Sequence, residues 1–170
     1  MYPSKILMVV AKENFRDEEY LEPKKVFAQD GYKVEVVSSS SGDCFGIAGT
    51  KVHADHSLAH VHAADYEAVV FVGGIGAKEF FSDPLAHHLA KEALGAGLAV
   101  GAICIAPSIL ANAGILKDKK VTAFESEKEN LEKQGAKFTG ADVEVDGNLV
   151  TANGPDAATE FAEKVVEQIK

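Results

Sequence analysis

Two short runs in which every residue is apolar constrain the fold more than any other feature of this sequence. Residues 6–10 and 69–72 each have the length of a strand and contain no polar position. A strand that is apolar on both sides must be covered on both faces, which is typical of the central strands of a parallel sheet. We therefore expect these two segments near the centre of such a sheet.

Strand-like and helix-like segments alternate along most of the chain. The strand patterns cover residues 5–11, 33–38, 68–72 and 98–103, and the helix patterns cover residues 17–30 and 84–96. Alternation of this kind predicts a parallel sheet with helices on both faces. A strand is also predicted over residues 120–123 and a helix over residues 125–134. Two alternating segments flank Asp146-Gly147-Asn148, which is a strong hairpin signal, and a final helix is predicted from Asp156. Between Ser38 and Tyr66 the pattern breaks, and we expect a surface excursion with a short hairpin.

Length and composition limit the class of protein. A chain of 170 residues is about one domain long, so we expect a single domain over residues 1–170. Its 26 acidic and 17 basic residues give a formal net charge of -9, which argues against a duplex-binding surface. No apolar run approaches the roughly 18 residues of a membrane span, and no cleavable signal is recognisable. We expect a soluble, cytoplasmic protein with no nucleic-acid or membrane partner.

One of the two cysteines lies where a buried strand turns into a helix. Cys104 follows the strand pattern of residues 98–103, and Pro107 stands near the first helical position, where its missing N–H does no harm. This is the arrangement of a nucleophile elbow at the C-terminal edge of a sheet. Free N–H groups at the helix start favour the thiolate, so we expect a lowered pKa for Cys104. The alternative is a small buried hydrophobe, and Cys44 fits that description or a surface thiol.

A carboxylate is predicted to face into the protein. In the helix pattern of residues 17–30, Asp17 is a candidate N-cap and Glu19 falls on the same stripe as Phe27. Pro23 has no N–H to donate to the carbonyl of Glu19, which loosens the helix there. Burial would raise the pKa of Glu19, and its protonated carboxyl could donate a hydrogen bond to a thiolate or an oxidised sulfur. A surface glutamate that reaches solvent is the alternative.

Glycines follow the second apolar strand. Gly73, Gly74 and Gly76 form a turn whose free N–H groups could bind an anion or a developing oxyanion. A dinucleotide site would have G-x-G-x-x-G directly after the first strand, so nucleotide binding is not indicated. A simple tight turn is one interpretation, and a pair of oxyanion donors, the N–H groups of Gly74 and Ile105, is the other.

Histidines gather in the segment of residues 53–62. His53, His56, His60 and His62 lie there with Asp55, and His56 with His60 has the i, i+4 spacing of a helical metal pair. A zinc site needs fixed geometry and supporting contacts that a loop of this composition does not provide. We therefore expect solvated histidines, no metal and no cofactor.

Together these motifs resemble the DJ-1/ThiJ/PfpI superfamily, which has the class I glutamine amidotransferase-like fold. The resemblance covers nearly the whole chain. It rests on Gly73-Gly74, on Ala102-Ile103-Cys104, on Glu19 four residues before Pro23, and on the closing segments Thr151 to Pro155 and Glu160-Phe161-Ala162.

The resemblance implies both an architecture and a site. The fold would be α/β, a flavodoxin-like three-layer α/β/α sandwich with a mainly parallel central sheet and a small C-terminal hairpin. Family members usually form homodimers or larger homo-oligomers. By resemblance, Cys104 is the reactive cysteine, Glu19 is its partner carboxyl, and Gly74 with Ile105 supplies the oxyanion donors.

Two departures from the family pattern bear on activity. Peptidase-like members have a histidine directly after the cysteine, where this chain has Ile105, and human-type members have one after the Lys-Val-Thr strand, where this chain has Phe124. Acyl transfer to an amine leaving group needs a proton donor, so peptidase or amidase activity is disfavoured.

Two functional hypotheses remain. One is a redox-responsive, stress-related protein that acts when a small-molecule oxidant oxidises Cys104 with the help of Glu19. The other is a cofactor-independent cysteine enzyme that acts on reactive carbonyls, like a glyoxalase or deglycase. The missing histidine favours the first hypothesis, because oxidation needs thiolate character and access but no general base.

Overall fold

The computed structural model describes residues 4–169, and seven strands of this part of the chain form the central sheet. Their order is β11-β12-β8-β7-β1-β3-β6, and every neighbouring pair is parallel except β11 with β12. The strands are β1 (Lys5–Val9), β3 (Lys33–Ser38), β6 (His56–Ser57), β7 (Ala68–Phe71), β8 (Ala99–Ile103), β11 (Val143–Asp146) and β12 (Leu149–Ala152). The two fully apolar runs become the adjacent strands β1 and β7 and are buried throughout.

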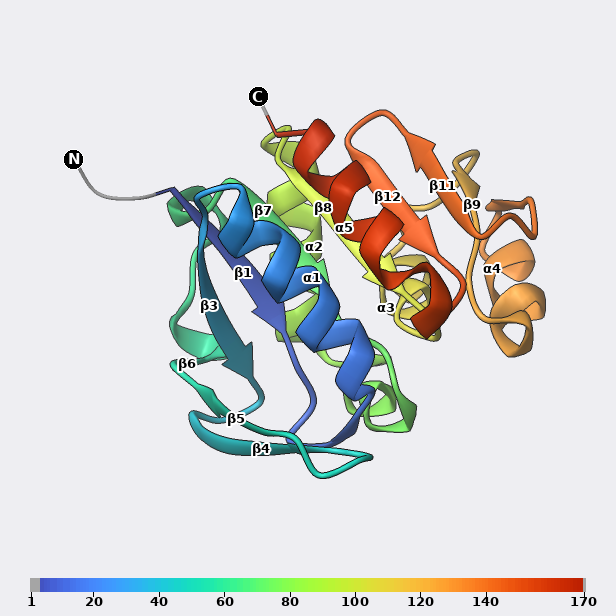
Figure 1. Cartoon of the computed structure of the whole chain (residues 1–170). Coiled ribbons are helices and arrows are strands. Elements are labelled where there is room, and N and C mark those ends of the chain that lie inside the picture. The colour runs from blue at the N-terminus through green and yellow to red at the C-terminus, as the bar shows by residue number, and fades with distance from the viewer. Residues whose placement is uncertain (1–3, 170) are drawn as a thin grey trace.

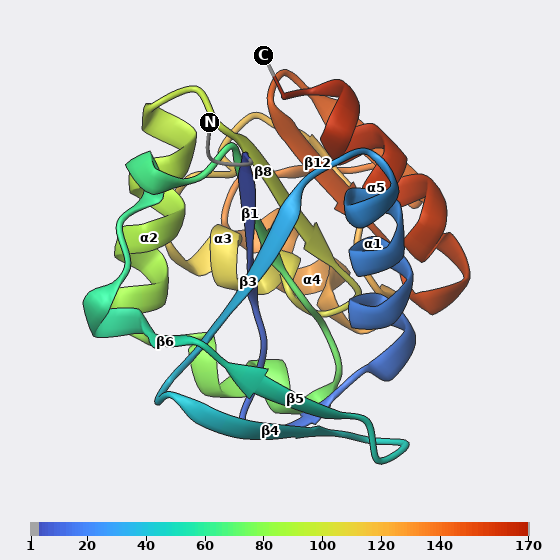
Figure 2. The same cartoon turned by 60° about the vertical axis from the view of Figure 1, so that its left-hand side comes forward.

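Helices cover both faces of this sheet, which confirms the three-layer α/β/α sandwich of the flavodoxin type (Figures 1 and 2). On one face, α1 (Asp17–Gln29) and α5 (Ala158–Glu167) lie side by side, and on the other lie α2 (Pro84–Gly95) and α3 (Pro107–Asn112). Helix α5 packs tightly because β8 has Gly101 beneath it. A Cβ atom at Gly101 would come within 2.8 Å of the Phe161 ring.

A small second sheet lies beyond the carboxyl ends of β1 and β3 (Figure 2). It consists of β2 (Glu13–Phe15), β4 (Gly42–Gly46) and β5 (Lys51–Ala54), with β4 and β5 forming the hairpin expected between residues 38 and 66. Two short 3-10 helices, Leu58–His60 and Ala63–Asp65, complete that excursion.

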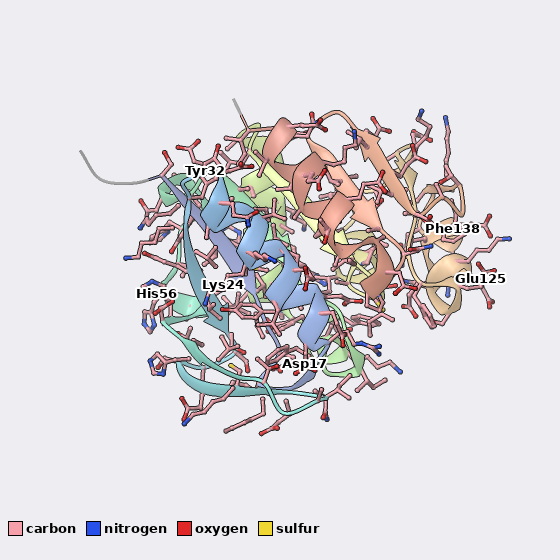
Figure 3. The ribbon with its side chains drawn as sticks, viewed as in Figure 1. Asp17, Lys24, Tyr32, His56, Glu125 and Phe138 are labelled. Atoms are coloured by element: carbon pink, nitrogen blue, oxygen red, sulfur yellow. The ribbon has the colours of Figure 1, made fainter. Side chains whose placement is uncertain are left out.

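Asp17 ties this second sheet to α1, and its predicted role as an N-cap is wrong. The N-cap residue is Arg16, and Asp17 is the first residue of the helix. Asp17 lies at the start of α1, facing the second sheet (Figure 3). Its carboxylate accepts hydrogen bonds from the backbone N–H groups of Ala48, at 2.8 Å, and Thr50, at 3.0 Å, in the turn between β4 and β5. Because the carboxylate of Asp17 bonds to donors in this distant turn, it does not cap the helix, and no other side chain among residues 4–169 does so.

The C-terminal region differs in detail from the expectation. The predicted hairpin is β11 with β12, but β12 also pairs in parallel with β8, so the hairpin extends the central sheet. The strand expected near residues 120–123 is β9 (Lys120–Val121), which pairs with β10 (Lys137–Phe138) outside that sheet. The helix expected over residues 125–134 is split into a 3-10 turn, Glu125–Glu127, and α4 (Lys128–Lys133).

The remaining 3-10 helices are Ile75–Phe80, after the Gly73-Gly74 turn, and Pro155–Ala157, which precedes α5. Across residues 4–169, no helix has both the length and the apolar character that crossing a membrane requires.

Candidate active site around Cys104

Cys104 stands on the tight turn that the sequence predicts between β8 and α3. Its φ angle is 64°, in the left-handed region that non-glycine residues rarely occupy. The turn is held from two sides: the N–H of Cys104 donates to the carbonyl of Ala152 at 2.9 Å, and its carbonyl accepts from the N–H of Phe124 at 2.8 Å. These bonds to β12 and to the segment after β9 fix the strained conformation that presents the thiol at the carboxyl edge of the sheet.

Glu19 reaches the same edge from α1 and is fully buried, as its place on the apolar stripe predicts. Both of its carboxylate oxygens are buried, and neither has a hydrogen bond of good geometry among the residues described. The Gly73-Gly74 turn makes room for this carboxylate. A Cβ atom at Gly73 would collide with Oε1 of Glu19 and with the Cβ of Cys104. Glycine at position 73 therefore allows the acid and the thiol to lie side by side.

Burial governs the protonation of Glu19. Desolvation raises its pKa to about 7, although the nearby Cys104 thiol, the charge of Arg16 and the N–H of Gly73 each act to lower it. Such a carboxyl is a mixture of acid and carboxylate near neutral pH. It can therefore both accept and donate a proton in the range where enzymes and stress proteins work.

The predicted lowering of the Cys104 pKa is wrong. Burial and the negative charge of Glu19 raise it to about 12, against the backbone N–H groups of Gly74 and Ile105, which act to lower it. The two N–H groups predicted from the sequence are therefore in place beside the sulfur. They are outweighed because the sulfur is largely desolvated and faces an ionised carboxylate.

The thiol and the carboxyl form a coupled pair, because each ionisation makes the other harder. The pKa is about 7 for Glu19 and about 12 for Cys104, so the pair holds a single proton at pH values between these two. If that proton moves from sulfur to Glu19, the resulting thiolate lies beside a neutral acid and the N–H groups of Gly74 and Ile105. This is the nucleophilic form of the site.

The thiol opens into a cavity of about 650 Å³. No histidine is among the described residues that line it, so the missing family histidines are not replaced by one from elsewhere in residues 4–169. The lining residues are Arg16, Ile47, Gly74, Ile75, Lys78, Cys104, Ile105, Phe124, Ser126, Glu127 and Pro155.

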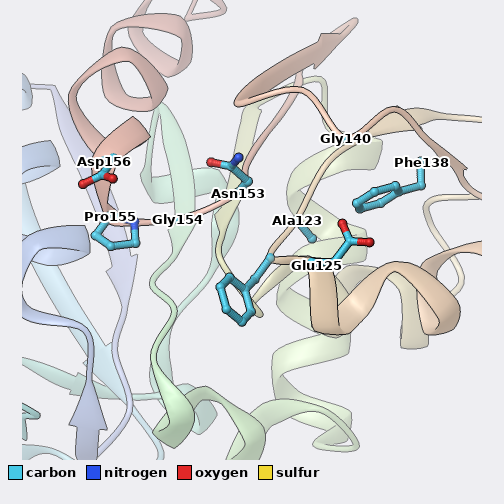
Figure 4. A pocket seen from close by; sticks show the side chains of 9 residues that line it. Ala123, Glu125, Phe138, Gly140, Asn153, Gly154, Pro155 and Asp156 are labelled. Carbon is cyan, nitrogen blue, oxygen red and sulfur yellow. The ribbon is translucent and has the colours of Figure 1, made fainter.

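A second cavity, of about 310 Å³, adjoins the first and shares Phe124 and Pro155 with it. Asn153 and Asp156 lie on one side of it, and Glu125 and Phe138 on the other (Figure 4). It contains no nucleophile and extends the space around the Cys104 cavity.

Three charged residues of the Cys104 cavity were missed by the sequence reasoning: Arg16, Lys78 and Glu127. Both oxygens of the Glu127 carboxylate are occupied, because Oε1 accepts from the Ser108 hydroxyl at 2.6 Å and Oε2 from the Ser126 hydroxyl at 2.7 Å. No motif marks these positions. They meet only because the segments after β2, β7 and β9 converge at one edge.

The other cysteine and the histidine stretch lie apart from this cavity. Cys44 is fully buried on β4. His56 bonds to Glu35 at 3.0 Å, and His60 to Ser57 at 2.8 Å. His56 lies on β6 and His60 on a 3-10 helix, so their spacing does not place them on one helix. Among residues 4–169, no three potential metal ligands converge.

Comparison with known proteins identifies the family. The family model described as the DJ-1/PfpI family matches residues 4–168. The chain belongs to the DJ-1/PfpI family. An uncharacterized protein of Methanocaldococcus jannaschii is 43% identical over 100% of this chain and 84% of that protein. A deglycase of Pyrococcus horikoshii is 28% identical over 98% of this chain and 99% of its own length.

The fold of the family extends over the same span. The crystal structure of a ThiJ/PfpI domain protein from Brachyspira murdochii superposes with a TM-score of 0.94 at 38% identity, covering 96% of this chain and 95% of that one. The DJ-1/PfpI family resemblance drawn from the glycine turn, the cysteine elbow and Glu19 is thus confirmed.

Proposed function

We propose that this DJ-1/PfpI family member is a redox-responsive cysteine protein in which Glu19 assists the oxidation of Cys104. The observation that carries the proposal is the buried carboxyl of Glu19, which lies beside the thiol and whose two oxygens have no hydrogen bond of good geometry among the residues described. A buried polar group without a partner is costly, so it indicates a role that the resting protein does not display.

The chemistry needs only an oxidant such as hydrogen peroxide. The proton of the Cys104 thiol passes to Glu19, and the thiolate attacks one peroxide oxygen. The O–O bond breaks, and the departing hydroxide leaves as water with the proton that Glu19 returns. The sulfur is thereby oxidised to the sulfenic acid, and a second peroxide oxidises it to the sulfinate. Glu19, protonated again from solvent, then donates a hydrogen bond to a sulfinate oxygen.

Peroxide titration followed by intact-mass and peptide analysis tests this. The parent should accumulate the sulfinate at Cys104 alone. Glu19→Gln keeps a donor but does not titrate, and Glu19→Ala removes the donor, so the sulfinate should become harder to trap in that order. Glu22→Gln, on the exposed face of the same helix, is the matched control and should behave as the parent. If Glu19→Ala gives the same product at the same site and rate as the parent, Glu19 plays no part.

A second candidate function is a cofactor-independent enzyme that acts on small reactive carbonyls. The observation that favours it is the 650 Å³ cavity above the thiol, which is large enough for a small substrate. The Cys104 sulfur would add to an aldehyde carbon while the carbonyl oxygen takes the proton that the thiol releases, which gives a thiohemiacetal. The N–H groups of Gly74 and Ile105 would donate hydrogen bonds to that oxygen. Methylglyoxal turnover by the parent, absent from Cys104→Ala, would support it, and equal background rates in both proteins would exclude it.

A further inference from the structure

The charge on the cavity wall differs from that of the whole protein. The chain has a formal net charge of -9, yet two of the three formally charged side chains that line the Cys104 cavity are cations. The one anion, Glu127, has both oxygens occupied by serine hydroxyls. The cations on the cavity wall therefore outnumber the carboxylate, and serine hydroxyls already donate to both oxygens of that carboxylate.

Arg16 is held firmly at the cavity wall. Its backbone N–H donates to the carbonyl of Gly73 at 2.9 Å, and the Gly74 turn approaches so closely that a Cβ atom there would collide with the Arg16 nitrogen. Its side chain is oriented by Glu18, which accepts from Nε at 2.7 Å. The two terminal nitrogens of the guanidinium have no acceptor among the residues described and remain available to a ligand.

Lys78 supplies the second cation. It lies on the 3-10 helix Ile75–Phe80 that follows the glycine turn, and its side chain is exposed. Within residues 4–169, no carboxylate lies within ion-pairing distance of it. A lysine that lines a cavity without an ion-pair partner is free to meet an anion.

The rim of the cavity is apolar. Ile47, Ile75 and Phe124 line it with 50%, 54% and 50% of their surfaces exposed. Most large apolar side chains of this protein are buried, so three half-exposed ones around one opening indicate contact with an apolar part of a ligand.

We infer that the Cys104 cavity recognises a small molecule that carries a carboxylate on an apolar body, with Arg16 and Lys78 as its anion-binding residues. A planar guanidinium matches a carboxylate in a forked geometry, and a lysine adds a second charge. This inference rests on the second candidate function. The substrate would then be a carbonyl compound that also carries a carboxylate, and Arg16 and Lys78 would hold the carboxylate while the thiol adds to the carbonyl.

Alkylation of Cys104 by two matched reagents tests the inference without any turnover. Iodoacetate and iodoacetamide both lose iodide to the thiolate sulfur but differ in charge. We measure the rate with iodoacetate divided by the rate with iodoacetamide at Cys104, and normalise it by the same quotient for the uncharged thiol 2-mercaptoethanol. We expect this normalised ratio to exceed unity, although the chain as a whole is acidic. Arg16→Gln and Lys78→Gln should each lower that ratio about threefold or more, with less effect in high salt. A change in the thiolate fraction of Cys104 alters both alkylation rates alike and therefore cancels in the ratio.

Lys25→Gln is the control, because it removes one positive charge at an exposed position of α1 outside the cavity, and it should leave the ratio unchanged. A normalised ratio at or below unity in the parent, or equal ratios in all four proteins, would overturn the inference.

A second measurement uses ligands that do not react. Benzoate should slow iodoacetamide labelling of Cys104 more than benzamide does, and Arg16→Gln should remove the difference. Equal protection by both compounds would contradict an anion site. Charge-selective labelling in a protein that does not turn over methylglyoxal would leave the anion site standing and exclude only the carbonyl activity on that substrate.

Discussion

The thiol of Cys104 lies beside the buried carboxyl of Glu19, and the two groups hold one proton between them once the pH rises above the Glu19 pKa of about 7. The pair forms because α1 covers the sheet next to the carboxyl end of β8 and because Gly73 has no side chain to separate them. Its chemistry depends on where that single proton resides. In the proposed mechanism a thiolate arises when Glu19 takes the proton, so Glu19 would serve as the base, and no histidine lines the cavity in the described part of the chain.

Stability should fall as Glu19 ionises. Its pKa is raised by burial from 4.5 to about 7 in the folded protein, so the folded state binds the proton more tightly than the unfolded state. This contribution is fully present below pH 4.5 and is lost as the pH rises through 7, with a total of about 3 kcal/mol. Urea unfolding between pH 4.5 and 8.5 measures this. Over that range, the free energy of unfolding of the parent should fall by about that amount relative to the free energy of unfolding of Glu19→Gln. Glu22→Gln should follow the parent, and parallel curves for all three proteins would contradict the buried titration.

Iodoacetamide should label Cys104 at least about tenfold faster than Cys44 in the folded protein, because access to the thiol controls the rate. Cys104 lines a cavity, whereas Cys44 is fully buried and burial raises its pKa as well. The Cys104 rate should still climb steeply above pH 8, since its pKa is raised and not lowered. Peptide mass analysis against pH measures both rates. A Cys104 rate that is already maximal at pH 7 would show that the thiol is more acidic than burial allows, and in urea the two rates should converge.

Peptide and amide hydrolysis should stay at background. Amine departure needs a proton donor, and no imidazole lines the Cys104 cavity among residues 4–169. Glu19 is fully buried and does not line the cavity where an amine would leave. Fluorogenic peptide and amide substrates, assayed with the parent and Cys104→Ala, should give equal rates. A cysteine-dependent rate well above that of Cys104→Ala would mean that a base reaches the site from another subunit.

Gly73→Ala should destabilise the protein and disrupt the Glu19–Cys104 pair. The new methyl group would collide with Oε1 of Glu19, the carbonyl of Ile103 and the Cβ of Cys104. Overpacking of this kind costs about 1–3 kcal/mol. Gly95→Ala is the matched control, because nothing lies within 4 Å of a Cβ at that helix position, and it should be neutral or slightly stabilising. Thermal unfolding and the pH dependence of Cys104 alkylation report the two effects, and equal behaviour of the two alanine variants would refute the steric argument.

Asp17→Ala should loosen the turn between β4 and β5. The backbone N–H groups of Ala48 and Thr50 would lose their acceptor in a partly exposed turn, which costs about 0.5–1.5 kcal/mol for each hydrogen bond. Hydrogen exchange at those two amides should be faster in Asp17→Ala than in the parent. The acceleration there should exceed that at the amides of the central strand β1. Unchanged exchange at Ala48 and Thr50 would show that the turn is held without the carboxylate.

Much of the architecture could be predicted because local patterns carry it. The apolar runs that become β1 and β7 have nowhere to lie except between two layers of helices, and strand-helix alternation permits few other topologies. Lys33–Ser38 was predicted with its observed bounds for the same reason. Glu19 was predicted to face inward because its position relative to Phe27 on α1 follows from the helical period.

Other features depend on segments that are distant in sequence. Asp17 looked like an N-cap until the β4–β5 turn supplied donors from residues more than thirty positions away. The pKa of Cys104 is raised, whereas the sequence predicted that it would be lowered. Burial and the charge of Glu19 on α1 raise it, and neither can be inferred from the cysteine's own turn.

The sequence by itself determined the sandwich, the cysteine elbow and the inward carboxylate, since each follows from periodicity or from the backbone demands of single residues. Only the tertiary structure decided which groups meet at the carboxyl edge of the sheet. Arg16, Lys78 and Glu127 carry no local signal, and they come together because parallel strands deliver three separate loops to one place. Desolvation and Coulomb interactions depend on distances through space, so the protonation of Glu19 and Cys104 follows from the packing of these loops.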